Sequence, residues 1–485
     1  MTAAYISASQ AGPATSQTSH AAMNVIAGHF ANVSIAAIDQ LRRFARSGTD
    51  TNTGTDGDAA QPAGHDQFKP AIGFCDLPGS KAIRKQRDIA TAMGLANPFF
   101  RSHDAAIGAT TRMDGRHFIN FASYDYLGLN QDARVANAAK DAINQYGTSV
   151  SASRVVAGER PLHRALERAI ASFYGVDDSI VFVSGHATNV STIAALMGPD
   201  DLVVHDELMH NSALVGAKLS RATTISFRHN DLAALERVLQ ENRSKHRNAL
   251  IVVEGLYSMD GDFPDLPRLI ELKQRFGAWL MVDEAHSLGV LGKTGHGVAE
   301  HFNVDPRAVD IWMGTLSKTL SGCGGYIAGT TALVELLKYQ APGFVYSVGL
   351  SPPATAGSLA ALEILQAEPE RVAKLQANGA LFLAEAKAAG LDTATSAGYS
   401  VVPVMIGCSV KAVRLTERLL ARGVNALPII HPAVPVKGAR LRFFITSEHT
   451  PKQIKAVVQI LREELDRINA ERVPVSKLVK AMMVT

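Results

Sequence analysis

The strongest constraint on the fold of this chain is an alternation between short apolar segments and longer amphipathic ones. Stretches with helical spacing, such as residues 231–246 and 266–277, separate the apolar segments. The predicted strands are residues 179–185, 201–207, 223–229, 249–255, 279–285 and 311–317. Near-continuous apolar strands that alternate with helices are typical of a mainly parallel sheet with helices on both faces. The sequence therefore predicts an α/β fold.

The pattern changes after Gly349, where helices alternate with only two further strands up to residue 468. This change predicts a smaller C-terminal α+β domain. At the other end, Ala21 to Arg46 has helical spacing, and residues 48–67 have the composition of a flexible linker. The predicted division is an N-terminal extension (1–67), an N-terminal arm (68–130), a large domain (131–348), a small domain (349–472) and a tail (473–485).

The composition excludes several classes of protein. A net charge of +3 over 485 residues is too small to predict a broad basic face for nucleic acid. The cysteines, Cys75, Cys323 and Cys408, lie far apart and lack both disulfide-scaffold and metal-ligand spacing. No apolar run reaches the roughly 18 residues that span a bilayer, and the first Lys or Arg is Arg42, so a basic signal region is missing. We expect a cytoplasmic protein with no transmembrane segment and no bound metal.

Two residues that suggest chemistry follow neighbouring predicted strands, and ligands gather at such strand ends in an α/β sheet. Asp283 follows the apolar residues 279–282, and Lys318 follows the next strand, among small and hydroxyl residues. A buried carboxylate needs a cation or donors, and beneath a pyridine nitrogen it would keep that nitrogen protonated. Alone, Asp283 could equally cap a helix or bind a metal, and a lone loop lysine is usually a surface residue. Together they favour pyridoxal phosphate (PLP), whose aldehyde such a lysine could reach.

Other polar residues at strand ends strengthen this interpretation. They are Ser184 to Asn189, His210, Ser258, His286, Thr315, Ser317 and Thr319. The first group follows a strand and opens a helix, so its backbone N–H groups could hold a phosphate, and the threonine and serine hydroxyls near Lys318 could do the same. The histidines suit stacking on a pyridine ring or donating to its hydroxyl. Each histidine alone is more often structural, so their joint occurrence carries the prediction.

Eight segments, in this order, resemble the α-oxoamine synthases, a family of PLP enzymes of fold type I. They are FINFASYDYLGL (118–129), SRVVAGERPLHRALE (153–167), SGHATN (184–189), DELMHNS (206–212), EGLYSMDGD (254–262), VDEAHSLGVLG (282–292), GTLSKTLSGCGGYIAG (314–329) and HPAVPVKGARLRF (431–443). The resemblance covers roughly residues 97–470, and the segments together are highly specific, although several are weak alone. It implies an aspartate aminotransferase-like fold in which the large domain binds PLP.

The resemblance implies a role for each candidate residue. Lys318 would bind the PLP aldehyde as a Schiff base, Asp283 would pair with the pyridine nitrogen, and His210 would stack on the ring. The remaining cofactor contacts would come from Ser184, Gly185, His186, Ser258, His286, Thr315 and Ser317, with Ser347 reaching a phosphate across a homodimer interface. Arg442 would bind the amino-acid carboxylate through its planar fork, and Tyr124 is a further substrate-binding candidate.

The implied reaction is a decarboxylative Claisen-type condensation. A small L-amino acid (serine, alanine or glycine) would react with an acyl thioester, carried by coenzyme A or by an acyl carrier protein, to give an α-aminoketone, CO₂ and a free thiol. Lys318 would remove the α-proton, and His210 would polarise the thioester carbonyl. The alternatives are aminotransfer or aldol cleavage, because the same lysine and aspartate serve those reactions, and a catalytically silent PLP-binding subunit.

Tyr124 departs from the usual family pattern. Family members of the biotin and threonine pathways typically carry Asn at this position, whereas the forms SYDYLG and SKTLSGCGGY are nearer to serine palmitoyltransferases and to synthases associated with polyketide assembly. His186 also stands where the family is often aromatic. We therefore expect a long or specialised acyl group, and we hypothesise that the N-terminal extension helps to dock its carrier.

Overall fold

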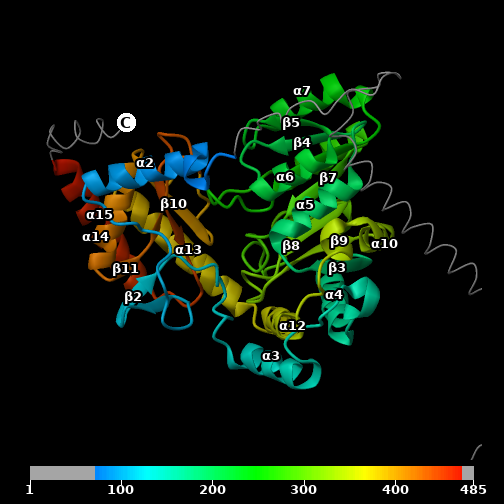
Figure 1. Cartoon of the computed structure of the whole chain (residues 1–485), viewed down its shortest axis with the longest axis horizontal. Helices are drawn as coiled ribbons and strands as arrows, with labels where there is room; N and C mark the ends of the chain where they lie inside the picture. Colours follow the sequence, from blue (N-terminus) through cyan, green and yellow to red (C-terminus); the bar gives the residue numbers. More distant parts are fainter. Residues whose placement is uncertain (1–70, 472–485) are drawn as a thin grey trace, which may run out of the picture. The chain divides into compact units, whose positions relative to one another are not determined.

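The computed structural model describes residues 71–471. The predicted N-terminal helix, the linker and the C-terminal tail lie outside these residues. A seven-stranded sheet in the order β3-β9-β8-β7-β6-β4-β5, on the right in Figure 1, is the largest sheet of the described chain. Its strands are β3 (Asp178–Phe182), β4 (Leu202–Asp206), β5 (Thr223–Phe227), β6 (Ala249–Glu254), β7 (Trp279–Asp283), β8 (Ile311–Thr315) and β9 (Gly325–Gly329). The β5-β4-β6-β7-β8 part is parallel, which confirms the α/β class. All six predicted strands are present, the sixth being β3.

The sequence did not predict β9, which lies between β3 and β8 and is antiparallel to both. Its first residue, Gly325, permits the close packing of α5 (Gly185–Leu196), because a Cβ there would come within 2.5 Å of Thr188 Oγ1. Glycines lower strand propensity, so a segment that begins GCGGY has a weak strand signal. Tertiary packing overrides that local preference.

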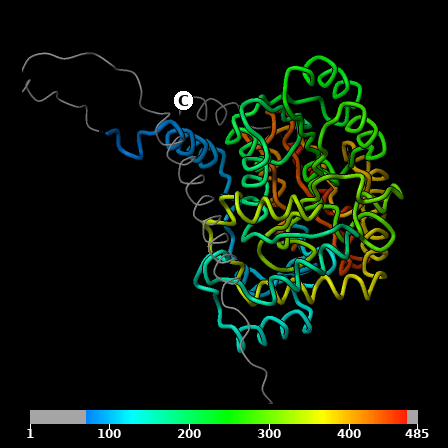
Figure 2. The backbone as a smooth tube through the Cα atoms, turned by 90° about the vertical axis from the view of Figure 1, so that its right-hand side faces the viewer, coloured from blue at the N-terminus to red at the C-terminus, as the bar shows by residue number. Residues whose placement is uncertain are grey.

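The two faces of the sheet are buried in separate cores because successive strand residues point to opposite sides. On β6, Leu250 and Val252 belong to one core, and Ile251 and Val253 belong to the other. The helices around this sheet are α4 (Pro161–Tyr174), α5, α6 (Asn211–Ser220), α7 (Leu232–Asn242), α8 (Leu266–Phe276), α9 (Val298–Phe302), α10 (Thr331–Gln340) and α11 (Pro342–Val345). Further out, α12 (Pro352–Ala367) packs on both α4 and α3 (Ala133–Tyr146) (Figure 2).

The C-terminal segment forms a smaller α+β unit, as predicted. Its sheet has the order β10-β13-β12, with all pairs antiparallel. Its elements are α13 (Glu370–Ala388), β10 (Val401–Met405), α14 (Ser409–Ala421), β11 (Val424–Asn425), β12 (Leu427–Ile429), β13 (Arg440–Phe444) and α15 (Pro451–Ala470). No helix among residues 71–471 is long and apolar enough to cross a membrane.

An N-terminal hairpin joins this C-terminal unit. The strands β1 (Thr110–Met113) and β2 (Arg116–Asn120) pair antiparallel, and β2 runs parallel to β11 (Figure 1). Between these two strands, Asn425 Nδ2 donates to Asn120 Oδ1 at 2.8 Å in a buried hydrogen bond. The segment before this hairpin holds α2 (Pro78–Ala92), none of whose residues is buried. The residues that follow the hairpin carry Tyr124 and Tyr126 back toward the central sheet, where they meet the site described below.

Candidate active site

A pocket of about 210 Å³ lies at the carboxyl ends of the parallel strands. Nine of the predicted site residues line it: Ser184, Gly185, His186, His210, Asp283, His286, Thr315, Ser317 and Lys318. They come together because each follows or ends a strand, and the carboxyl ends of parallel strands meet at one edge of the sheet. The pocket therefore gathers the residues that the sequence singles out at separate strand ends.

Lys318 carries the amine of this pocket. Its Nζ lies 5.7 Å from the centre of the Tyr124 ring and makes no hydrogen bond or ion pair to protein within residues 71–471. Burial lowers the pKa of Lys318 to about 8, although the charges of Asp283 and Glu254 oppose this shift. A desolvated amine of this kind is neutral in a large fraction of molecules near pH 8, as a nucleophile or base must be.

A chain of hydrogen bonds runs from His210 to Asp283. His210 Nδ1 and Ser212 Oγ are 2.7 Å apart, and Asn189 Nδ2 donates to Ser212 Oγ at 2.9 Å and to Asp283 Oδ2 at 2.8 Å. The other carboxylate oxygen, Oδ1, accepts from Ala285 N at 3.0 Å. The sequence analysis considered only the backbone of Asn189, at the end of the predicted phosphate turn, and assigned no role to its side chain. Its amide fixes the Asp283 carboxylate toward the pocket.

The turn before α5 forms one end of the pocket. Ser184 is the N-cap of this twelve-residue helix, and Gly185 and His186 are its first residues. A Cβ on Gly185 would lie 2.8 Å from Thr315 Oγ1, so only glycine permits this close approach. The Thr315 and Ser317 hydroxyls are 2.9 Å apart. Hydroxyls that face a helix N-terminus suit an anion such as phosphate.

His286 is a neutral imidazole inside the site. Its Nδ1 is 2.6 Å from the hydroxyl of Tyr126, a residue that the sequence reasoning did not single out. Burial lowers the pKa of His286 well below its usual value, and the charges of Lys318 and Arg442 act in the same direction. Tyr126 lies in the FINFASYDYLGL segment, so its position in a family motif was the available signal.

Three predicted residues border the pocket without lining it. Ser258 donates its backbone N–H to Glu254 Oε2 at 3.0 Å, and its carbonyl accepts from Arg442 Nη1 at 2.8 Å. The buried Nε of Arg442 has no partner in the described chain, and its guanidinium lies 4.5 Å from the ring centre of Phe444. Tyr124 packs edge-on against the rings of Phe444 and His286. Arg442 is thus a cation held by a carbonyl and an aromatic face, with no carboxylate partner among residues 71–471.

Ser347 is not brought into this pocket. It lies in the loop after α11, beside the exposed side chains of Tyr346 and Val348. Its predicted role required a second subunit, so a single chain leaves that role untested.

The sequence reasoning also missed Glu254, which lines the pocket. It is paired in register with Asp283 across β6 and β7 and is 2% exposed. Burial, together with the nearby Asp283 charge, raises the pKa of Glu254 to about 8. Its Oε1 has no partner among the described residues. The signal in the sequence was the same as for Asp283, an acidic residue that directly ends an apolar strand.

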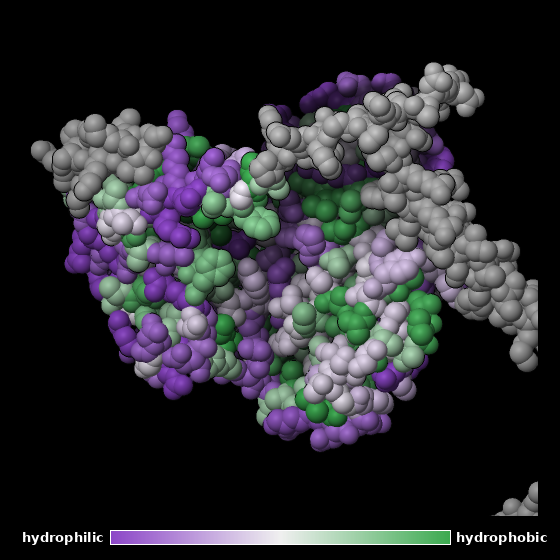
Figure 3. Space-filling model, in the orientation of Figure 1, coloured by the Kyte–Doolittle hydropathy of each residue, from purple (hydrophilic) through white to green (hydrophobic). Residues whose placement is uncertain are grey.

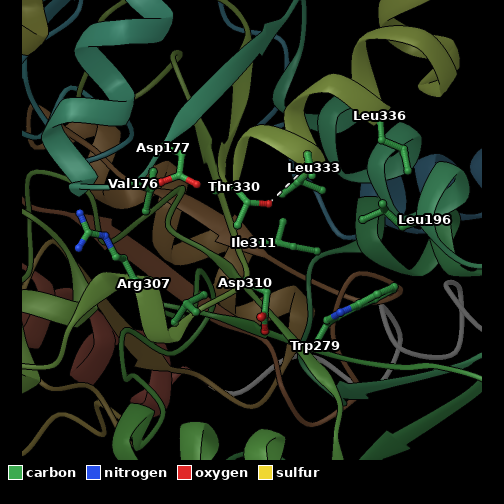
Figure 4. A pocket seen from close by; sticks show the side chains of 13 residues that line it. Val176, Asp177, Leu196, Trp279, Arg307, Asp310, Ile311, Thr330, Leu333 and Leu336 are labelled. Carbon is green, nitrogen blue, oxygen red and sulfur yellow. Dashed lines mark hydrogen bonds between the residues drawn. The ribbon is translucent and has the colours of Figure 1, made fainter.

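A larger cavity lies at the opposite ends of the same strands. It measures about 430 Å³ and is lined by residues that begin β7 and β8, including Trp279 and Ile311 (Figure 4). Its lining is mostly apolar and contains no lysine, histidine or cysteine. The carboxylate of Asp310, at its edge, is already paired with Lys273 at 2.7 Å. The larger of the two cavities is therefore the one with fewer side chains that can act as nucleophile, acid or base.

The residues around the smaller pocket fit PLP on the chemistry of their donors. The pocket offers an amine, a fixed carboxylate, a helix N-terminus with hydroxyls, and a neutral histidine beside them. The carboxamide oxygen of Asn189 and the Oε1 of Glu254 are buried and lack partners in the described chain. Buried polar atoms are normally hydrogen-bonded in native proteins, so these atoms indicate that a polar ligand belongs here.

The comparisons with known proteins agree with this geometry. The model of the family "Aminotransferase class I and II" matches residues 116–461. The chain is 42% identical to a putative 8-amino-7-oxononanoate synthase of Gloeothece citriformis, over 73% of this chain and 92% of the relative. It is 37% identical to an 8-amino-7-oxononanoate synthase of Thermoanaerobacter pseudethanolicus, over 75% and 91%.

A solved structure extends the likeness to three dimensions. A serine palmitoyltransferase from S. paucimobilis, with a bound PLP–myriocin adduct, superposes with a TM-score of 0.77 at 27% identity, over 80% of this chain and 98% of that one. This chain therefore belongs to the aminotransferase class I and II family and, within it, to the PLP-dependent α-oxoamine synthases.

Proposed function

We propose that this enzyme condenses a small L-amino acid with an acyl thioester to give an α-aminoketone, CO₂ and a free thiol. The observation that carries the proposal is Arg442, a guanidinium without a carboxylate partner in the described chain, held beside the pocket of Lys318 and Asp283. A planar guanidinium binds a carboxylate through two parallel hydrogen bonds. It would therefore orient an amino acid with its Cα toward the Lys318 amine.

PLP, when bound, supplies an electron-withdrawing ring that stabilises negative charge at the amino-acid Cα. The residues that would hold it are Ser184, Gly185, His186, Thr315 and Ser317 around the phosphate, His210 over the ring, and Ser258 and His286 near the ring hydroxyl. Asp283, fixed by Asn189, would hold a proton on the ring nitrogen.

Lys318 moves the proton in this proposal. With a pKa of about 8, its amine can accept the Cα proton and later return it to the product. The pKa of His210 is lowered by burial, so its imidazole is neutral and can donate one N–H to the thioester carbonyl as negative charge develops on the oxygen. Arg442 keeps the amino acid in place during both steps.

Absorbance titration of the purified protein tests the proposal. We expect a yellow protein whose spectrum shifts with one of glycine, L-alanine or L-serine, followed by thiol release when an acyl thioester is added. Lys318→Ala should abolish thiol release and change the starting spectrum. A wild-type protein that transaminates a keto acid, and releases no thiol from any thioester, would instead place it with the aminotransferases.

We also propose that the enzyme is a homodimer. Val155, Val156, Tyr346 and Val348 are between 48% and 83% exposed. They form one surface, because Ser153 Oγ donates to the carbonyl of Val345 and the Gly349 amide donates to the carbonyl of Ala152. Apolar side chains reach the surface at several further places (Figure 3). A contiguous exposed apolar patch suits subunit contact, and across it Ser347 would contact the phosphate of the second subunit. Light scattering of the purified protein tests the assembly.

The substrates and the cellular setting complete the proposal. We propose a long or specialised acyl group, carried by coenzyme A or by an acyl carrier protein, and a role for the N-terminal extension (1–67) in docking the carrier. Deletion of residues 1–67 without loss of activity toward carrier-bound substrates would refute that role.

We propose a cytoplasmic location, because Cys75, Cys323 and Cys408 are free and exposed and a reducing compartment keeps them so. We further propose that the large domain is residues 131–348 and the small domain 349–472.

A further inference from the structure

His229 lies outside the pocket but is bonded to two loops that border it. It follows β5 and is 16% exposed. Its Nδ1 is 3.0 Å from Asp206 Oδ1, and its Nε2 is 3.0 Å from Asp262 Oδ2. Ionised carboxylates only accept hydrogen bonds, so both ring nitrogens must donate. This geometry makes His229 an imidazolium held between two carboxylates.

The charge of His229 persists at neutral pH. Burial alone would lower the pKa of His229, but the hydrogen bonds and charges of Asp206 and Asp262 outweigh it and raise the pKa to about 10. The other titratable groups that face it are Tyr257, whose ring lies edge-on at 4.5 Å, and Glu207, whose Oε1 accepts from the His229 amide at 3.0 Å. No other cation is paired with Asp206 or Asp262 in the described chain, so His229 alone offsets the buried Asp206 and the partly buried Asp262.

Asp206 connects His229 to the loop that carries His210. It ends β4 and its side chain is fully buried. Its Oδ1 also accepts from Leu208 N at 2.8 Å, and its Oδ2 from Asn230 N at 2.9 Å. The loop is therefore fixed two residues before His210, which is the N-cap of α6 and lines the pocket.

Asp262 connects His229 to the opposite side of the site. It lies in the loop after β6, and its carbonyl accepts from Tyr257 N at 2.8 Å. That loop carries Ser258, whose carbonyl holds Arg442. Asp262 Oδ2 also accepts from Thr395 Oγ1 at 2.7 Å, so the same carboxylate reaches the C-terminal unit.

We propose that His229 is a positioning residue that holds the His210 loop and the Ser258–Arg442 loop at a fixed separation. The inference rests on the proposed function, in which His210 lies over the cofactor ring and Arg442 binds the amino-acid carboxylate. The clamp sets the distance between these two contacts without touching either ligand. A partly buried charge with two anionic partners suits this task, because removing it leaves both carboxylates without their cation and loosens both loops.

The test uses the PLP-loaded, full-length protein and the variant His229→Gln. Hydrogen exchange should become faster in residues 206–212 and 255–262, while α10, which packs on β3 at the opposite edge of the sheet, stays at the wild-type rate. The affinity for the amino acid, read from the absorbance shift, should fall about tenfold. The cofactor content should fall less than the affinity for the amino acid, because Lys318 and Asp283 lie outside both loops whereas His210 and Ser258 lie within them. His229→Arg, which restores a cation with donors on two sides, should recover at least part of the affinity.

Two further variants keep the result interpretable. Arg228→Gln removes the neighbouring exposed pair with Asp231 and should leave exchange and affinity as in the wild type. Asp262→Asn tests the same clamp from its other end if His229→Gln does not fold, and in the double variant its effect should not add to that of His229→Gln.

Wild-type exchange in both loops of His229→Gln, or equal changes in Arg228→Gln, would overturn the clamp. If no amino acid shifts the wild-type spectrum, the proposed function fails, and the exchange data alone then decide whether the clamp exists.

Discussion

The two ends of the central sheet are built from the same strands, but one end forms a polar pocket and the other a mostly apolar cavity. At the carboxyl ends of β7 and β8, the small pocket contains an amine and two carboxyl groups. The pKa values of the amine, Lys318, and of one carboxyl group, Glu254, are strongly shifted. At the amino ends of these strands, the larger cavity is lined mainly by apolar side chains, and Asp310 at its edge is paired with Lys273. The strands thus provide one frame with two different linings.

The difference teaches that buried polar atoms without partners, and not volume, distinguish the small pocket from the larger cavity, since none of the residues lining the larger cavity has such an atom. Burying a polar group costs free energy unless a partner offsets it, so proteins rarely retain such groups without a use. Asn189 Oδ1 and Glu254 Oε1 lack partners in the described chain, and both lie at the small pocket. The shifted pKa values of Glu254 and Lys318 belong to the same pocket, where burial and neighbouring charges produce them.

The sharpest test of the comparison is Asp283→Asn. The amide has nearly the same shape but carries no negative charge, so it cannot hold a proton on a ring nitrogen. We expect kcat for thiol release to fall by roughly 10²- to 10⁴-fold. Steady-state kinetics at saturating amino acid and thioester measure this change. A fall of less than about tenfold would mean that the carboxylate at this strand end has only a structural role.

Arg442→Lys is expected to have the next largest effect. Lysine keeps the positive charge but lacks the planar fork that binds a carboxylate with two bonds. The KM for the amino acid should rise roughly 10- to 100-fold, and kcat should change much less. Arg307→Lys is the matched control, because Arg307 lines the larger cavity at the other end of the sheet. Equal effects of the two variants would remove the distinction between the ends.

A smaller effect, on stability, is expected from Glu254→Gln. Burial raises the folded-state pKa of Glu254 from 4.5 to about 8, so between these values the folded chain keeps a proton that the unfolded chain releases. The wild-type free energy of unfolding should therefore fall as pH rises from 5 to 8, and Glu254→Gln should lose this dependence. We expect the two profiles to diverge by about 1–2 kcal/mol. Urea unfolding at three pH values measures it, and parallel profiles would show that Glu254 ionises freely.

Local pattern was enough to predict most of the fold and part of the site. Apolar runs identified the six strands, and Asp283 and Lys318 were predictable because each stands directly after such a run. The strand β9 was not predictable, because it begins with Gly325, a residue of low strand propensity that the close packing of α5 requires. The site also contains Asn189, Tyr126 and Glu254. Their contacts there join strands and loops that are far apart in sequence, and residue spacing along the chain does not predict such contacts.

The preference for a serine palmitoyltransferase-like substrate shows the same limit. It rested on the SYDYLG and SKTLSGCGGY forms, on His186 and on Tyr124, whose ring lies beside Lys318, His286 and Phe444. The sequence relatives named above are 8-amino-7-oxononanoate synthases, whereas the superposed structure is a serine palmitoyltransferase. The acyl group is set by the shape of the space around such side chains, and the substrate branch stays a prediction.

The smallest effect on catalysis should come from Asp310→Asn, the same chemical change as Asp283→Asn at the other end of the sheet. Asp310 accepts from Lys273 at 2.7 Å and from the Leu280 amide at 2.7 Å, and its side chain is 31% exposed. Because solvent screens this pair, losing the charge should lower the free energy of unfolding by only about 1 kcal/mol. The kinetic constants should stay within about twofold of the wild type, since the change lies at the opposite ends of the strands from Lys318. Urea unfolding and thiol-release kinetics on one preparation measure both quantities. A loss of activity comparable to that of Asp283→Asn, with stability unchanged, would show that the two ends of the sheet are coupled and that the larger cavity takes part in the reaction.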